Sequence, residues 1–267
     1  MANSLLWMGI CATCASACAS FDVTWQPADD PVTSPDSGIP IPDAASVVSD
    51  APPVAIDAPP AAAFCPPGDD TLIACYDFDG QSGEDGSPYG HDLTTTNVGF
   101  QPGVTGYALH VNTGSTVRTP GSPALNVAAV TMELWIYPEE LPQAGRMGLI
   151  DSDGRYGMFL YAGGQVRCSS SSGSTTLFID YDLPLQAWTH LACTNDGNEL
   201  ALWVDGTMRG NTSSSPLASS GNGGLAVGMN SPSGDNFVGA IDNVRVWEII
   251  RSSEEICAAA DANCAAP

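Results

Sequence analysis

The chain has 267 residues, of which 7 are Lys or Arg and 30 are Asp or Glu, so its formal net charge is −23 at pH 7. It contains no lysine, and its acidity excludes nucleic-acid or anionic-membrane binding that depends on a basic surface. Its length permits one large domain or two small ones, its 28 glycines and 21 prolines favour turns over helix, and no apolar run beyond the N-terminal segment is long enough for an internal transmembrane helix.

The first 18 residues predict an export signal. An apolar and small-residue run extends from Leu5 to Ala17, and its last three residues are small, as required before a signal cleavage site. Cys18 follows directly, which resembles a bacterial lipoprotein signal, in which this cysteine carries the lipid. A plain secretory signal, cut near the same place, is the alternative. We expect an extracytoplasmic protein, either secreted or held at the bacterial outer membrane or cell surface, whose only membrane contact is a lipid anchor at Cys18.

Residues 19–64 differ sharply in composition from the rest. They hold nine prolines, ten alanines, seven aspartates and no basic residue. A coiled coil is excluded because no apolar residue repeats with the aspartates and the prolines would break a helix. We therefore expect a disordered, acidic linker. Six of the aspartates recur at intervals of seven residues: Asp22, Asp29, Asp36, Asp43, Asp50 and Asp57.

Residues 65–267 have the size of a single large β-sandwich. Short strand-like runs recur along them, and Asp-Gly or Gly-Gly pairs between several runs supply the backbone conformations of tight hairpins. Only Ser252–Ala260 predicts a helix, with Ser252 or Ser253 as its N-cap. The fold class is therefore all-β, with antiparallel strands and one short C-terminal helix. The predicted strands are Thr71–Phe78, Ala108–Val111, Thr116–Thr119, Val130–Tyr137, Met147–Asp151, Tyr156–Tyr161, Gln165–Ser169, Thr175–Tyr181, Trp188–Asn195, Glu199–Val204, Leu225–Met229 and Phe237–Trp247.

Three segments of this region carry a family resemblance. Val130–Pro138 (V-T-M-E-L-W-I-Y-P) resembles an early strand of laminin G-like domains. Trp188–Cys193 (W-T-H-L-A-C), followed by Asn198–Gly206 (N-E-L-A-L-W-V-D-G), is similar to a hairpin of that family, and Gly239–Trp247 (G-A-I-D-N-V-R-V-W) to its closing strand. The resemblance implies a laminin G-like, two-sheet jelly roll of the concanavalin A-like lectin/glucanase superfamily over residues 65–267.

The same resemblance raises the question of catalysis, because related folds include retaining glucanases with an E-x-D-x-x-E strand that places two carboxylates across a sugar. This chain has no such run, and it has no Gly-x-Ser-x-Gly elbow either. His190 lies in a strand motif and is interpreted as a hydrogen-bonded residue of the sandwich. The sequence therefore predicts a protein that is not an enzyme.

Six cysteines remain in the domain, and in an exported protein they predict disulfides. Cys168 and Cys193 lie on predicted strands of one meander, which favours a cross-strand bond. Cys65 with Cys75 would clamp the linker to the first strand, and Cys257 with Cys264 would close off the C-terminal helix. The rival arrangement cross-links the two ends of the domain. A zinc site is not expected, since no Cys-x-x-Cys or Cys/His cluster occurs here.

Calcium is the cofactor for which the sequence offers candidate ligands. Asp77 and Asp79 flank the end of the first predicted strand, and Asp242 lies on the closing strand that would neighbour it. Together they could supply oxygen ligands to Ca²⁺. The alternative is that Asp242 accepts backbone hydrogen bonds at a turn.

A ligand face should carry aromatic rings that stack on sugars. The candidate residues are Trp203, Tyr156, Tyr161 and Phe237. The predicted function is non-catalytic recognition of a glycan or a surface protein. A structural or adhesive protein–protein module without sugar binding is the alternative, and a glycoside hydrolase ranks third.

Overall fold

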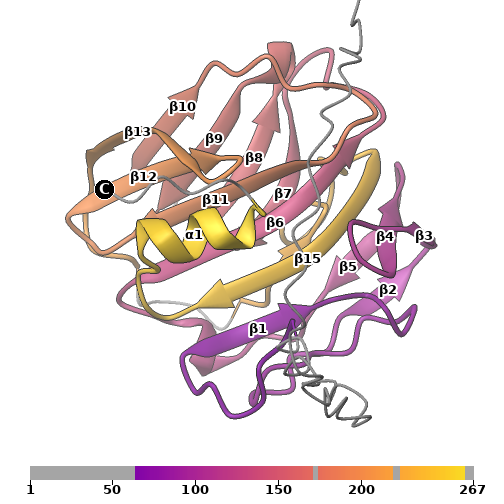
Figure 1. Cartoon of the computed structure of the whole chain (residues 1–267), viewed down its shortest axis with the longest axis horizontal. Helices are drawn as coiled ribbons and strands as arrows, with labels where there is room; N and C mark the ends of the chain where they lie inside the picture. The colour runs from indigo at the N-terminus through magenta and orange to yellow at the C-terminus, as the bar shows by residue number, and fades with distance from the viewer. Residues whose placement is uncertain (1–63, 171–173, 219–222, 262–267) are drawn as a thin grey trace, which may run out of the picture. The chain divides into compact units, whose positions relative to one another are not determined.

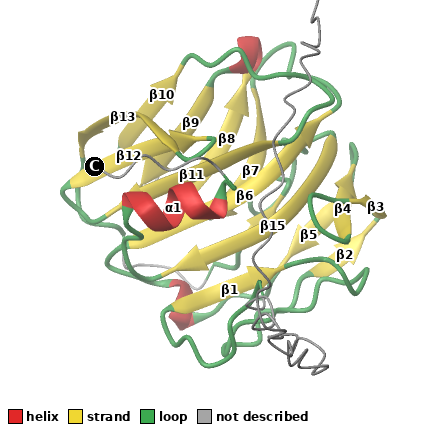
Figure 2. Ribbon diagram, in the orientation of Figure 1, coloured by secondary structure: helices red, strands yellow, loops and turns green. Residues whose placement is uncertain are grey.

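The computed structural model describes residues 64–170, 174–218 and 223–261 of the chain. These residues form two antiparallel β-sheets packed face to face, with one short α-helix (Figures 1 and 2). This confirms the predicted all-β jelly-roll sandwich. The predicted signal segment, Cys18, the linker up to residue 63 and Cys264 lie outside the described residues. No helix in the described part combines the length and apolar character needed to cross a bilayer.

The first sheet, sheet A, is built around two nine-residue strands, β6 and β15, which pair with each other. Its order is β13-β12-β11-β6-β15-β4-β3, and β1 pairs with the C-terminal half of β15, beyond β4. The bounds of its strands are Leu72–Tyr76 (β1), Gly99–Pro102 (β3), Tyr107–Val111 (β4), Val130–Pro138 (β6), Thr189–Asn195 (β11), Glu199–Val204 (β12), Thr207–Ser213 (β13) and Gly239–Trp247 (β15).

The second sheet, sheet B, has the order β10-β9-β8-β7-β14-β5-β2. The short β14 joins β7 to β5, and β2 forms the edge of the sheet beyond β5. Sequence reasoning missed β2, β3 and β13, which are short or largely exposed and so carry little apolar pattern. The bounds in sheet B are Thr94–Thr96 (β2), Thr116–Arg118 (β5), Arg146–Ser152 (β7), Tyr156–Tyr161 (β8), Val166–Ser170 (β9), Thr175–Ile179 (β10) and Ala226–Val227 (β14).

The core lies between the sheets because every second residue of a strand points inward. In β6 the inward residues Met132, Leu134 and Ile136 are fully buried, and in β8 Met158 and Leu160 are. Burial of such side chains stabilises the fold by about 1.5–3 kcal/mol each. The two sheets are therefore held by one continuous apolar layer.

Two disulfides join the cysteine pairs named from the sequence. Cys65 is bonded to Cys75 on β1, and Cys168 to Cys193. The second bond differs in place from the expectation: Cys168 is on β9 in sheet B and Cys193 is on β11 in sheet A, so the bond crosses the core instead of joining neighbours in one meander. Cys257 is also disulfide-bonded.

The helix α1 (Ser253–Ala259) covers the outer face of sheet A, in front of β11 and β6 in Figure 1. Ser252 is its N-cap and forms a capping box with Glu255, which satisfies backbone N–H groups at the helix start. The buried side chain of Ile256 packs on Ala192 and Trp203. The outer face of sheet B has no helix over it in the described part of the chain.

Candidate functional site

Three of the four aromatic residues predicted to contact a ligand are buried: Phe237, Trp203 and Tyr156. Phe237 is fully buried in the core between the sheets. Trp203 projects from the outer face of sheet A, but α1 covers it and leaves it 7% exposed. For Phe237 and Trp203 the prediction was wrong, because the elements that cover them come from distant parts of the chain.

The two tyrosines among the predicted aromatics lie on β8 in sheet B. Tyr156 points inward, and its hydroxyl donates to the carbonyl of Leu125 at 3.3 Å, although the residue also borders a surface hollow described below. Tyr161 is half-buried and forms an edge-to-face pair with Phe178, with ring centroids 5.2 Å apart. Phe178 is 44% exposed. A partly exposed aromatic pair therefore lies at the β8–β10 end of sheet B.

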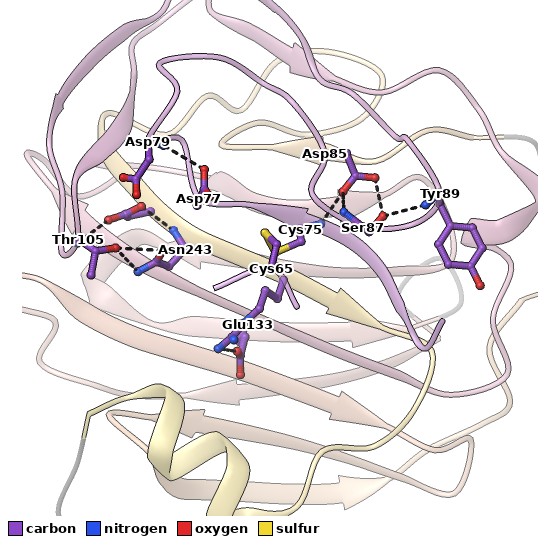
Figure 3. Close-up of a disulfide and its surroundings, with 12 residues drawn as sticks. Cys65, Cys75, Asp77, Asp79, Asp85, Ser87, Tyr89, Thr105, Glu133 and Asn243 are labelled. Atoms are coloured by element: carbon purple, nitrogen blue, oxygen red, sulfur yellow. Dashed lines mark hydrogen bonds and ion pairs between the residues drawn. A yellow bond between two sulfur atoms is a disulfide. The ribbon is translucent and has the colours of Figure 1, made fainter. Parts of the chain in front are cut away.

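The three aspartates predicted to bind calcium hold the backbone of a loop. Asp242 Oδ2 accepts from the N–H of Val104 at 2.8 Å and of Thr105 at 3.3 Å, and Asp79 Oδ1 accepts from the N–H of Tyr107 at 2.9 Å. Asp77 accepts from the N–H of Asp79 at 3.1 Å. Figure 3 shows Asp77, Asp79 and Thr105 on one side of the Cys65–Cys75 disulfide.

The N–H groups that this loop donates allow β15 to carry the buried carboxylate of Asp242. The β6–β15 register shifts after Asp242, and Asn243 takes a left-handed backbone conformation. Gly103 and Gly106 let the loop approach closely, since a Cβ at either position would collide with the Asp242 or Asp79 carboxylate. Burial raises the pKa of Asp242 to about 6. Across the described residues no group of three Asp, Glu, His or Cys side chains is arranged to hold a metal, so calcium here stays a prediction.

A buried polar cluster lies on the outer face of sheet A. Glu133 is 1% exposed and forms an ion pair with Arg245, and His190 Nε2 lies 4.0 Å from its other carboxylate oxygen. Burial lowers the pKa of His190 to about 3, so this histidine is neutral at physiological pH. The cluster is covered by α1 and the Phe64–Trp247 side of the domain. We therefore assign it a structural role.

Among the described residues, the outer face of sheet B has no α-helix over it, and there guanidinium groups lie over an aromatic ring. Phe159 points outward from β8 opposite Arg167 on β9, and Phe178 on β10 lies on the other side of Arg167. The guanidinium carbon of Arg146 is 4.3 Å from the Phe159 ring centroid, and that of Arg167 is 5.7 Å away. These cation–π contacts hold two cationic donors flat on the sheet.

Beside this arginine-covered ring lies a hollow of about 230 Å³. Its polar walls come from sheet B and from the loop after β14. Arg146 is fixed there by two bonds, from Nε to Asp235 at 2.8 Å and from Nη2 to Asn230 at 2.7 Å. The side chains and backbone that line the hollow belong to Arg146, Asp151, Asp153, Gly154, Arg155, Tyr156, Phe159, Arg167, Ser169, Ser170, Asn230 and Ser231.

Two glycines make room for this arrangement. A Cβ at Gly148 on β7 would collide with the backbone of Met229 and Asn230, so glycine here lets the loop pack directly on the sheet. A Cβ at Gly157 on β8 would collide with the Phe159 ring. The loop is then tied down by Gly148 N–H, which donates to the carbonyl of Asp235 at 2.7 Å.

Asp151 is the buried acid of the hollow. It is 7% exposed, and its Oδ2 accepts from the N–H of Ser231 at 2.7 Å. Burial raises its pKa to about 6, and the nearby Asp153 adds to the rise, whereas Arg146 and Arg167 oppose it. Its charge therefore changes near neutral pH.

A second hollow of about 400 Å³ adjoins the first and shares Asp153 and Ser231 with it. It reaches across β5 to Thr94 on β2, and Arg118 lies in its wall with Nη1 donating to the carbonyl of Pro232 at 3.2 Å. The two hollows form one groove across sheet B, which we call the sheet B groove. Sequence reasoning missed its arginines, although their outward positions could be read from the alternation of the predicted strands.

The family model of the concanavalin A-like lectin/glucanases superfamily matches residues 111–257. This span includes the three sequence motifs and most strands of both sheets. The chain belongs to the concanavalin A-like lectin/glucanase superfamily. Its laminin G-like family model therefore confirms the resemblance drawn from the motifs. A comparison with curated proteins found no match.

Solved structures with this superfamily's jelly roll match the chain over about the same extent. One of them is domain 4 of AbnA, an extracellular GH43 arabinanase from Geobacillus stearothermophilus, solved in complex with arabinotriose. It is 23% identical to this chain, the match covers 71% of this chain and 98% of that domain, and the TM-score is 0.60. The binding domain of Paraclostridial Mosquitocidal Protein 1 is 15% identical, with coverages of 72% and 52% and a TM-score of 0.59. The binding domain of botulinum neurotoxin DC, solved with rat synaptotagmin II, is 13% identical, with coverages of 72% and 51% and a TM-score of 0.56. The chain thus spans about half of these toxin domains, and the likenesses show a shared fold.

Proposed function

We propose that this protein is a non-catalytic glycan-binding module and that the sheet B groove is its binding site. The observation that carries the proposal is that one sheet face combines a partly exposed aromatic pair, Tyr161 and Phe178, with a polar hollow next to it. A sugar has apolar C–H faces and a rim of hydroxyl groups, and this face offers a partner for each.

The polar groups of the groove are held in place before any ligand arrives. Arg146 is bound by Asp235 and Asn230, and Arg155 donates to Asn126 Oδ1 and to the carbonyl of Gly223, each at 2.6 Å. Such groups lose little conformational entropy on binding, which favours affinity. The fold relative AbnA domain 4 was solved with an arabinose oligosaccharide, which supports the choice of a sugar ligand.

The proposal also covers where the protein works. The Cys65–Cys75 and Cys168–Cys193 disulfides favour an oxidising compartment outside the cytoplasm. A lipid anchor at Cys18 with an acidic linker would present the domain away from a membrane. A surface protein as partner, without sugar binding, remains the rival function, and it needs no aromatic pair beside a polar hollow.

The test is a glycan array followed by titration of the best binder with wild type and Phe178→Ala. Phe178 flanks the groove beyond β9, and removing an aromatic ring that stacks on a ligand costs about 1 kcal/mol or more, which is roughly a fivefold or larger loss of affinity. The matched control is Tyr107→Ala, which removes a 41%-exposed aromatic from β4 in sheet A and should leave affinity unchanged. Equal binding by wild type and Phe178→Ala would remove this face as the site. Release of reducing ends from the bound glycan would show that the protein is an enzyme.

A further inference from the structure

Positive charge in this protein is scarce and concentrated. The chain has no lysine, and its seven basic residues are all arginines in a molecule of net charge −23. Four of them line the sheet B groove. The other three lie elsewhere, two of them next to Trp247 and one over Tyr181. The four groove arginines are Arg118, Arg146, Arg155 and Arg167.

Most of these groove arginines have no carboxylate partner. Arg146 is paired with Asp235, but no ion pair within 4 Å is formed by Arg118, Arg155 or Arg167 in the described part of the chain. By contrast, Arg245 and Arg251 on the sheet A side are paired with glutamates. Arg155 is 1% exposed and already donates to Asn126 and Gly223, but Arg118 is exposed and Arg167 is half-buried. In so acidic a protein, the guanidinium groups of Arg118 and Arg167 are therefore available to an anionic ligand.

Arg167 is the better placed of the two. It donates to the hydroxyl of Tyr161, lies over the aromatic rings of Tyr161 and Phe178, and lines the first hollow. Its Nε is buried and has no hydrogen-bond partner within the described structure. A buried donor without a partner is costly, and a ligand that supplies an acceptor at this point would remove the cost.

We propose that the glycan bound in the sheet B groove is an acidic chain whose sugars carry carboxylate groups, and that Arg167 binds one of them. This inference rests on the proposed function. A planar carboxylate fits the fork of a guanidinium group with two parallel hydrogen bonds. Arg118, four strands away across the sheet, would serve a second carboxylate further along the chain.

The groove has the length that such a chain requires. From β9, which carries Arg167, to β5, which carries Arg118, there are four strand spacings, or roughly 19 Å at about 4.8 Å each. A nucleic acid is disfavoured, because the dense negative charge of its backbone would be repelled by a protein of net charge −23. A glycan with one carboxylate per sugar carries its charge less densely than duplex DNA, which has one charge per about 1.7 Å, so the repulsion is weaker and single carboxylates can meet separate arginines.

The test uses the full chain and matched pairs of polymers: oligosaccharides of polygalacturonate, alginate and hyaluronate, each against its own carboxyl-reduced form. The expected result is at least tenfold tighter binding of one or more acidic forms than of their reduced partners. Dextran sulfate serves as a polyanion without carboxylates and is expected to bind more weakly than the acidic form that binds best.

Variants then locate the effect. Arg167→Gln should lose most of the preference for the acidic form, and Arg167→Lys, which keeps the charge but not the fork, should retain part of it. Arg209→Gln is the matched control, since Arg209 is exposed on β13 in sheet A, away from the groove. Unchanged unfolding midpoints for the variants would show that folding is intact.

Two different failures can be told apart. If no acidic form binds more tightly than its reduced partner, or if dextran sulfate binds as tightly as the best of them, the inference of a carboxylate ligand is overturned. Neutral glycans that still bind, with a loss in Phe178→Ala, would leave the proposed function standing. Absence of all glycan binding would overturn both.

Discussion

Replacing Asp151 with asparagine should stabilise the protein at neutral pH and barely affect it in acid. The amide oxygen of Asn can accept the Ser231 N–H bond that Asp151 accepts now at 2.7 Å, and the volume is nearly unchanged. What the substitution removes is a carboxylate that is 7% exposed. Because burial raises the pKa of Asp151 from 3.8 to about 6, ionisation of this group opposes folding.

The sign and size follow from linkage. When the pKa of a carboxyl is higher in the folded than in the unfolded state, its ionisation costs no folding free energy at pH values well below the unfolded-state pKa. This cost grows as the pH rises from the unfolded-state pKa to the folded-state pKa. With pKa values of 3.8 and about 6, the cost is about 0.5 kcal/mol at pH 4 and about 3 kcal/mol at pH 7. Asp151→Asn should therefore raise the free energy of unfolding by up to that amount at pH 7.

The assay is urea unfolding of the oxidised full chain at pH 4 and pH 7, monitored by tryptophan fluorescence. Asp153→Asn is the matched control, since Asp153 is exposed in the adjoining turn and its substitution should change stability by less than about 0.5 kcal/mol. Equal effects of Asp151→Asn at both pH values, or destabilisation at pH 7, would refute the reasoning. The same variant should bind an anionic glycan more tightly at pH 7, because it removes a negative charge from the groove.

Three further predictions concern residues outside the groove. Trp203→Ala should lower the free energy of unfolding by about 3–5 kcal/mol, because the ring is buried under α1. The folded fraction of this variant should keep its glycan affinity. Loss of glycan binding in a variant of unchanged stability would instead place Trp203 in the binding site. Replacing Cys168 and Cys193 by serine opens a loop of 25 residues and should lower the free energy of unfolding, measured by chemical denaturation, by about 3.5 kcal/mol. An unchanged free energy of unfolding would mean that the disulfide across the core is not formed. If the predicted calcium site forms, a thermal melt should show a midpoint several degrees higher with calcium than with EDTA, and Asp242→Asn should abolish that rise. Equal midpoints would reject the site and leave the Asp79 and Asp242 carboxylates with their backbone N–H donors alone.

Most of the fold could be predicted from the sequence because the signals for its strands, turns and helix are local. Strand β6 alternates inward Met132 and Leu134 with outward Glu133 and Trp135, and this alternation can be read without any partner. The hairpin at Asp205-Gly206 is equally local, since Asp205 and Gly206 both adopt positive φ there. The helix N-cap at Ser252 follows from four neighbouring residues.

The candidate site could not be read in the same way, because it depends on what covers each face. Trp203 and Phe159 are both outward aromatics on sandwich strands, and the sequence does not say that Trp203 lies under a helix 50 residues later. Phe159 lies under arginines from two neighbouring strands, and the groove wall comes from a loop 70 residues further on. Such contacts between distant segments decide which face remains open.

The central claim is that the outer face of sheet B binds the glycan, and hydrogen–deuterium exchange of the full chain with and without the best-binding glycan tests it most directly. The account predicts slower exchange in β7–β10 and in the loop of residues 229–236, with no change in α1 or β12. Protection confined to sheet A and α1, with sheet B unchanged, would contradict it.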